Sequence, residues 1–224
     1  MSSEALVEKP MTTGTGPTPG GAGLPEAGPW EQCFDLDPGR STPVRDRGSR
    51  HLYYSLAETL RPVVLNARAL ADRPLRALVL GCDEGYLAHR LLEWGADRIL
   101  AVDSRADALD RARFIREHRG IGPDRLELRL CADASALGIA AGEHDLVIAD
   151  GRPARLGSWP DSLELIARSG TTCALIAPDR LQGATALSEA GFGKPALLEP
   201  PADAERRLVA FELNLLLARA RETE

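Results

Sequence analysis

The sequence lacks several features that mark whole classes of protein. No apolar run approaches ~18 residues, and the N-terminal stretch has no hydrophobic signal core, so we expect neither a membrane span nor a secretory leader. The chain carries 27 Lys and Arg against 33 Asp and Glu, a formal net charge of -6. An acidic chain is poorly suited to neutralising phosphates, so nucleic acid is not an expected partner. These absences favour a soluble, cytoplasmic protein.

The cysteines do not form a metal or disulfide pattern. The chain has four of them, and they lie far apart without a CxxC pair or paired histidines. Neither a zinc site nor a disulfide framework is therefore expected, and no metal is predicted. We interpret Cys33, Cys82, Cys131 and Cys173 as reduced thiols, three of them in or beside predicted strands.

The length of 224 residues and the hydrophobic content of 44% are enough for one well-buried domain with an appendage. Residues 1–28 are rich in Gly, Pro, Thr and Ala and have almost no periodic apolar positions, which predicts a disordered tail. Residues 29–72 are expected to form an N-terminal extension with lid helices, and residues 73–224 the main domain. The oligomeric state stays open, with a homodimer as one alternative.

The most informative stretch runs from Leu78 to Asp103. A short apolar strand breaks at Gly81-Cys82-Asp83-Glu84-Gly85, and apolar residues then recur at helical spacing until Gly95. The run Ile99-Leu-Ala-Val102 predicts a second buried strand that ends at Asp103. A strand, a glycine turn and an acid ~20 residues later is the general layout of a site for an adenosine-containing cofactor.

The flanking segments predict a βα alternation. Before the first strand, Trp30 and Phe34 are candidate anchors for a short extended piece, and a helix from about Ser49 is expected to end before Pro62, with a second short helix after it. Further strands are predicted at Leu126–Leu130, His144–Ala149, Thr171–Ala177, Ala196–Leu198 and Leu208–Leu217. The link between the last two is too short for a helical crossover, so they should form an antiparallel hairpin. The pattern predicts an α/β fold with a mostly parallel sheet and one reversed strand.

This arrangement resembles the class I S-adenosylmethionine-dependent methyltransferases over about residues 50–220. The resemblance implies a Rossmann-like, doubly wound sheet of seven strands with one antiparallel strand, and S-adenosylmethionine as the cofactor. In that family the glycine turn passes under the methionine part, one acid holds the ribose and another meets the adenine. The positions that this resemblance assigns to cofactor binding are Tyr53, Gly81, Cys82, Asp83, Gly85, Tyr86, Asp103, Ser104, Asp133, Ala134 and Asp150. Asp83 replaces the middle glycine, where a short carboxylate can face the cofactor's ammonium group.

A narrower resemblance concerns the wobble-uridine tRNA methyltransferase-like branch. Trp30, Leu36, Gly39, Thr42 and Pro43 are similar to the segment that precedes the domain in that branch. The branch follows its fourth strand with a Leu-Tyr-His-Leu-type segment, but this chain has Gly151-Arg-Pro-Ala-Arg-Leu-Gly-Ser-Trp159 instead. The branch's substrate is therefore not carried over, and the acidic composition also argues against tRNA.

Methyl transfer mainly requires positioning of the acceptor and exclusion of water, and a general base is needed only for some acceptors. The candidates for that role are Asp150, His51, Tyr53 or Tyr54, and Arg152, of which we select Asp150 and His51. Each candidate site residue also has a structural alternative. Gly81 and Gly85 can form a plain turn, Asp103 and Asp150 can cap helices, Asp133 can be a solvated loop acid, and Tyr53 can be a packing residue. Ser104 with Asp107 has capping-box spacing, and His89 favours a surface or helix-dipole role.

Three functions compete at this stage. The first is a methyltransferase that acts on a small molecule, with a specialised metabolite as one alternative for that acceptor. The second is a fold that binds S-adenosylmethionine but has lost methyl transfer, as a partner protein or as an enzyme of another class such as a cyclase or isomerase. A nicotinamide dehydrogenase ranks third, because the turn lacks the third glycine of the dinucleotide fingerprint.

Overall fold

The computed structural model describes residues 30–44, 47–132, 134–140, 143–151, 163–164, 166–167, 172–201, 208 and 213–221. The tail predicted for residues 1–28 lies outside the described residues, as do Asp133, Arg152 and Trp159. Within the described part, no helix is both long enough and apolar enough to cross a membrane.

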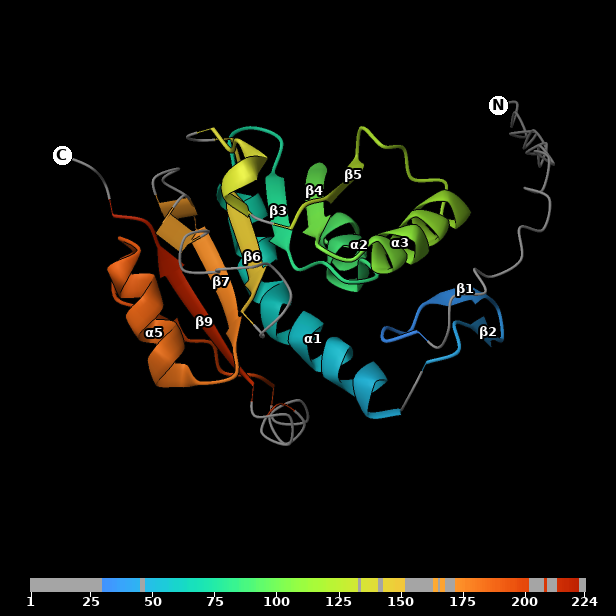
Figure 1. Cartoon of the computed structure of the whole chain (residues 1–224), viewed down its shortest axis with the longest axis horizontal. Helices are drawn as coiled ribbons and strands as arrows, with labels where there is room; N and C mark the ends of the chain where they lie inside the picture. The colour runs from blue at the N-terminus through green and yellow to red at the C-terminus, as the bar shows by residue number, and fades with distance from the viewer. Residues whose placement is uncertain are drawn as a thin grey trace, which may run out of the picture.

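The centre of the molecule is a seven-stranded sheet in the order β5-β4-β3-β6-β7-β9-β8 (Figure 1). Its strands are β3 (Arg76–Leu80), β4 (Arg98–Asp103), β5 (Leu126–Leu130), β6 (Leu146–Asp150), β7 (Thr172–Ala177), β8 (Ala196–Leu197) and β9 (Asn214–Arg219). β3 pairs in parallel with both β4 and β6, and β9 runs antiparallel to both β7 and β8. The predicted fold class is confirmed, including the single reversed strand.

The last strand is shorter than the sequence pattern predicts. β9 begins at Asn214, whereas the apolar pattern predicted a strand from Leu208. Leu208 is helical and buried, so its apolar character reflects packing against the core rather than membership of the strand. The predicted antiparallel pairing holds, with Leu197 opposite Leu216.

Helices cover both faces of the sheet. α1 (Arg47–Leu70), α2 (Tyr86–Glu93) and α3 (Ala106–His118) pack on one face, where α1 and α2 side chains meet inward residues such as Val79 and Ile148. The short 3-10 helix η1 (Ala134–Leu137) and α5 (Arg180–Glu189) pack on the other face. The chain changes face between β5 and β6, so β3 and β6 flank the topological switch point at which ligands bind in open α/β sheets.

α1 (Arg47–Leu70) is one continuous helix with Pro62 inside it. The prediction of two helices separated before Pro62 is therefore wrong. An internal proline removes one helical hydrogen bond and crowds the carbonyl four residues before it. Leu60 and Val64, on either side of Pro62, are nevertheless both fully buried in the core. Burial on both sides of the proline outweighs the local preference for a break.

The segment before α1 is docked on the domain. It contains the hairpin of β1 (Asp35–Asp37) and β2 (Arg40–Ser41). Trp30 and Phe34 are buried, as predicted, and their rings meet edge-on with centroids 6.0 Å apart. The Thr42 hydroxyl donates to the Gln32 carbonyl oxygen and accepts from the Phe34 N–H. This segment therefore contributes side chains to the same core as α1, α2 and α3.

Candidate active site

The turn after β3 keeps the backbone of a glycine turn even though its middle residue is an aspartate. Gly81, Asp83 and Gly85 have φ angles of 71°, 56° and 88°, all in the left-handed region. Asp83 is the only non-glycine residue with positive φ in the described part of the chain. A residue other than glycine adopts this backbone conformation at a cost of about 1–2 kcal/mol in conformational free energy, so surrounding contacts must hold Asp83 in place.

Asp103 holds the turn against the next strand. Its Oδ2 accepts a hydrogen bond of 2.7 Å from the Asp83 N–H, and its Oδ1 accepts one of 3.0 Å from the Arg105 N–H. The carboxylate is fully buried at the carboxyl end of β4. A direct hydrogen bond therefore joins the turn to the acid that ends β4.

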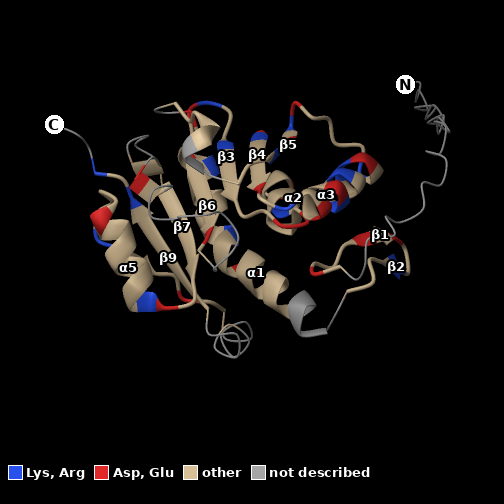
Figure 2. Ribbon diagram, in the orientation of Figure 1, with Lys and Arg blue, Asp and Glu red and all other residues tan. Residues whose placement is uncertain are grey.

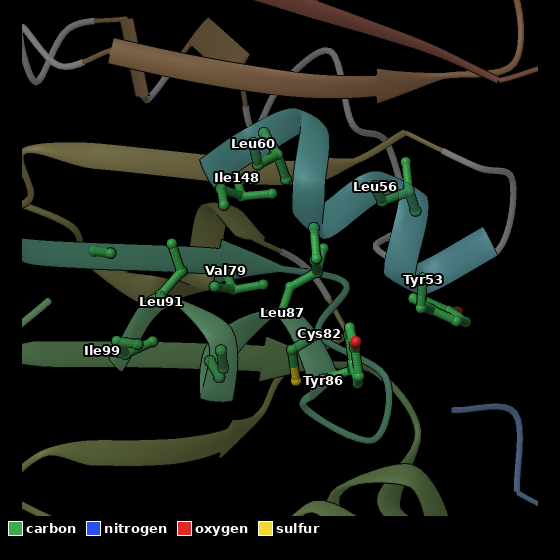
Figure 3. Close-up of a cluster of buried hydrophobic side chains, with 14 of the residues drawn as sticks. Tyr53, Leu56, Leu60, Val79, Cys82, Tyr86, Leu87, Leu91, Ile99 and Ile148 are labelled. Atoms are coloured by element: carbon green, nitrogen blue, oxygen red, sulfur yellow. The ribbon is translucent and has the colours of Figure 1, made fainter. Parts of the chain in front are cut away.

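Asp83 also connects the turn to α1. The Tyr53 hydroxyl donates a hydrogen bond of 2.7 Å to Oδ2 of Asp83. Figure 3 shows Tyr53 on α1 near Tyr86 at the start of α2, and their ring centroids are 6.2 Å apart. Burial raises the pKa of the Tyr86 hydroxyl, which accepts hydrogen bonds from Arg90. Tyr53 and Tyr86 therefore both lie beside the turn, and their assignment to cofactor binding stays a prediction.

Arg105 joins three carboxylates at this place, and we call the set of Arg105, Asp83, Asp103 and Glu31 the Arg105 cluster. The guanidinium pairs with Oδ1 of Asp83, lies 3.5 Å from Oδ1 of Asp103 and pairs with Oε1 of Glu31 at 3.2 Å. Burial alone would lower the pKa of Arg105, but Asp83, Asp103 and Glu31 together raise it above its usual value. Arg105 is therefore a permanent cation among the acids of the candidate site.

Glu84 and Gln32 fix the segment that precedes α1 to the start of α2. Glu84 is fully buried, accepts from the N–H groups of Glu31 and Gln32, and forms an ion pair of 2.8 Å with Arg111. Burial raises the pKa of Glu84 to about 7, against the opposing effect of these N–H groups. The Gln32 side chain accepts a hydrogen bond of 2.7 Å from the Tyr86 N–H, at the first turn of α2. These contacts are structural and place Glu31 beside Arg105.

Other predicted positions are partly accounted for. Cys82 is buried in the turn, and burial followed by the charges of Asp103 and Asp83 raises the pKa of its thiol. Ser104 follows β4 directly, but Arg105 is the N-cap of α3 and makes no side-chain capping bond, so the predicted capping box is wrong. Ala134 opens η1, whereas Asp133 lies outside the described residues. Asp150 is the buried last residue of β6, at the same sheet edge as Asp103.

His51 and Tyr54 lie elsewhere on α1. They line a pocket of about 610 Å³ whose other lining residues are Cys33, Asp35, Tyr86, Arg90, Glu93 and Arg119. Neither Asp103 nor Asp150 contributes to that lining. α1 thus turns Tyr53 toward Asp83, while its neighbour Tyr54 is 42% exposed. His51 as a catalytic residue stays a prediction that this geometry does not support.

Sequence reasoning missed Arg105, Glu31 and Gln32 as members of the site. Glu31 and Gln32 lie 53 and 52 residues before Glu84, so no local sequence pattern predicts their contacts with it. Arg105 could have been noticed from the sequence, because it stands two residues after the acid that ends β4. It was missed because the cofactor site that the resemblance implies assigns no role to an arginine at that position. Figure 2 shows this mixture of acidic and basic residues on α2 and α3, beside strands that carry few charges.

Comparisons with known proteins show the fold. No protein-family model matches the chain, and no curated protein matches it. Among solved structures, the N-terminal domain of EvdMO1 with SAH (S-adenosylhomocysteine) bound is similar at 22% identity and a TM-score of 0.55, over 74% of this chain and 81% of that one. The [4+2]-cyclase SpnF matches at 15% identity and a TM-score of 0.56, over 74% and 81%.

A Haloferax volcanii protein solved in complex with the Trm112 methyltransferase activator is also similar. It matches at 16% identity and a TM-score of 0.55, over 76% of this chain and 93% of that one. The matches show that the chain has the fold of S-adenosylmethionine-dependent methyltransferases. Because the sequence identities are low, they do not show its activity, which must be argued from the site. The narrower resemblance to the wobble-uridine branch stays a prediction.

The residues of the site fit this cofactor by position and by backbone conformation. Gly81, Asp83 and Gly85 all have left-handed φ, and Asp103 ends β4 beside this turn. The side chain of Arg105, however, pairs with both Asp83 and Asp103, the two carboxylates that the cofactor's ammonium and ribose would need. The fit therefore depends on movement of one side chain, whose exposed fraction is 30%.

Proposed function

We propose that the chain is an S-adenosylmethionine-dependent methyltransferase that acts on a small molecule. The observation that carries the proposal is the bond between the Asp83 N–H and Oδ2 of Asp103, made by a turn whose Asp83 has the φ angle of a glycine. A turn built only to connect β3 with α2 has no need for that strained conformation or for a fully buried acid behind it.

Each site residue has a role in this proposal. Asp103 receives the ribose hydroxyls, and Asp83 receives the ammonium group with Tyr53 holding its carboxylate in place. Gly81, Cys82 and Gly85 bring the backbone close to the methionine part, as Tyr86 begins the helix beyond it. Ser104, Asp133 and Ala134 are assigned to the adenine end. The bound cofactor would supply an activated methyl group on its sulfonium.

The acceptor is expected to bind beside Asp150. This buried carboxylate ends β6, on the opposite side of β3 from Asp103, at the switch point of the sheet. It can take a proton from a hydroxyl or an ammonium acceptor, and we therefore favour Asp150 over His51 as the general base. An acidic chain with a net charge of -6 favours a small molecule over a nucleic acid as acceptor.

Calorimetric titration with S-adenosylhomocysteine tests the proposal. The wild-type protein, Asp103→Asn and Asp110→Asn would be compared, since Asp110 is an exposed acid on α3 that pairs only locally with Arg113. We expect Asp103→Asn to weaken binding about 10- to 100-fold, because a hydrogen bond to a charged group contributes about 1.5–3 kcal/mol. Asp110→Asn should bind like wild type. Absence of binding by wild type and by Arg105→Ala alike would overturn the proposal.

A second candidate is the same fold without methyl transfer. The Arg105 cluster favours it, because the cation already neutralises the carboxylates that a cofactor would use. In that case the chain would serve as a partner protein or as an enzyme of another class, such as a cyclase. Cofactor binding without methyl consumption in the presence of acceptor candidates would favour this second function over the first.

A further inference from the structure

The Arg105 cluster places one flexible cation on two acids that the proposed cofactor also requires. The guanidinium reaches Oδ1 of Asp83 through Nη2 and Oδ1 of Asp103 through Nε, while Nη1 reaches Glu31. Asp83 and Asp103 are otherwise satisfied within the protein, by the Tyr53 hydroxyl and by backbone N–H groups. Arg105 thus contacts both carboxylates through a side chain that a rotamer change can remove.

We infer that Arg105 is an intramolecular competitor of the cofactor, which keeps the site closed until its guanidinium leaves Asp83 and Asp103. The inference rests on the proposed function. In the closed state the Arg105 guanidinium pairs with the Asp83 carboxylate, which would otherwise pair with the ammonium group of the cofactor. It also shields the Asp103 carboxylate that the ribose hydroxyls must reach.

The backbone at Arg105 allows this exchange without unfolding. The Arg105 N–H donates to Oδ1 of Asp103, and Arg105 occupies the N-cap position of α3. The main chain at Arg105 can therefore stay in place when the side chain turns. The side chain is 30% exposed, which gives it a path to solvent. Because only the side chain has to move, we expect the closed state to lower the apparent affinity rather than to prevent binding.

Glu31 makes the closed state stronger than a single ion pair. It belongs to the segment that Glu84 fixes by accepting from the Glu31 and Gln32 N–H groups. Docking of this segment therefore presents a third carboxylate to Arg105 from outside the turn. Because the protein must give up these contacts to bind the cofactor, the apparent affinity is reduced by the fraction of molecules in the open state.

The experiment compares S-adenosylhomocysteine binding by wild type, Arg105→Ala and Arg113→Ala in calorimetric titrations of the full chain. Arg113 is the matched control, because it lies on the same helix and pairs only with exposed Asp110. We expect Arg105→Ala to bind at least about tenfold more tightly than wild type, equivalent to about 1.4 kcal/mol. Arg113→Ala should match wild type.

Salt provides a readout that needs no substitution. S-adenosylhomocysteine has no net charge, so raising the salt concentration from ~0.05 M to ~0.5 M acts mainly on the partly exposed Arg105, whose pair with the partly exposed Glu31 is screened more than its pairs with buried Asp83 and Asp103. Wild-type affinity should rise severalfold over this range, while the affinity of Arg105→Ala should stay level. If Arg105→Ala does not fold, as checked by circular dichroism, the wild-type salt series alone decides: an affinity that is flat or falls with salt contradicts the inference.

The outcomes separate this inference from the proposed function. Equal affinity of wild type and Arg105→Ala overturns the competitor role and leaves a cofactor-binding protein. Tighter binding by the variant, with no effect in the control, supports both. No binding by either folded protein overturns the proposed function and the inference with it.

Discussion

The Tyr53 hydroxyl donates a hydrogen bond of 2.7 Å to Oδ2 of Asp83, which links the first helix to the turn after the first strand of the sheet. The two residues are 30 positions apart, and both are buried. The bond explains how an aspartate persists at a left-handed position: its carboxylate is held from α1 while its backbone N–H is held by Asp103. The helix therefore takes part in shaping the candidate site.

Replacing Tyr53 by phenylalanine should destabilise the protein. Tyr53→Phe removes one hydrogen bond to a buried carboxylate and leaves the ring packing unchanged, so we expect a loss of about 1.5–3 kcal/mol in the free energy of unfolding. Urea denaturation would measure it. Tyr54→Phe is the matched control, because that hydroxyl belongs to an exposed residue of the same helix. Equal midpoints for the two variants would contradict the role of the Tyr53 hydroxyl.

The conformation of Asp83 makes a second prediction. Asp83→Gly and Asp83→Ala both lose the carboxylate, but only glycine adopts a φ of 56° without strain. The strain of about 1–2 kcal/mol on alanine is partly offset by glycine's larger entropy in the unfolded chain, so Asp83→Gly should be the more stable variant by about 1 kcal/mol. Urea denaturation of both measures the difference. A more stable alanine variant would mean that the left-handed turn is not kept.

Much of the fold could be predicted because its signals are local. The β3 and β4 strands are short buried apolar runs, and the glycines after them mark where the chain must turn. Asp103 was predictable for the same reason, since it ends the run. The mostly parallel sheet with one reversed strand followed from the βα alternation and the short final link. Each of these inferences needs only neighbouring residues.

Features that depend on distant contacts were not predictable. α1 continues through Pro62 because Leu60 and Val64 are buried, and a pattern scan sees the proline but not the core. Arg105 meets Glu31 from 74 positions away. His89 was expected at the surface and is only 2% exposed, because the docked segment covers it with the Phe34 ring. Tertiary packing overrides the local preference in each case.

Gln32 gives a third prediction, on the docked segment. Gln32→Ala would leave the buried Tyr86 N–H without the acceptor that lies 2.7 Å away, and an unpaired buried donor costs about 1–3 kcal/mol. We expect a loss of that size in urea denaturation. Gln182→Ala, an exposed position on α5, is the control and should change stability by less than about 0.5 kcal/mol. A neutral Gln32→Ala would show that the segment does not fix the start of α2.

The last prediction concerns His89, for which burial, and then the charge of Arg119, lower the pKa from 6.5 to about 3. Neither ring nitrogen has a hydrogen-bond partner within the described structure. The unfolded chain takes up a proton below pH 6.5 while the folded protein does not, so stability is lost as the pH falls from 6.5 toward 3. The direction is therefore acid destabilisation.

His89→Leu should remove this part of the pH dependence. Between pH ~7 and ~5 the wild-type protein should lose about 2 kcal/mol more than the variant, as the linkage between protonation and folding requires. Some pH dependence will remain in the variant, because burial also lowers the pKa of His144 and raises the pKa of Glu84 to about 7, and the contribution of Glu84 has the opposite sign. His118→Leu, on neighbouring α3, is the control and should keep the wild-type slope over this range, since it leaves His89 in place. Urea denaturation at both pH values measures the slopes, and parallel slopes for wild type and His89→Leu would mean that His89 is already protonated in the folded protein or reaches solvent.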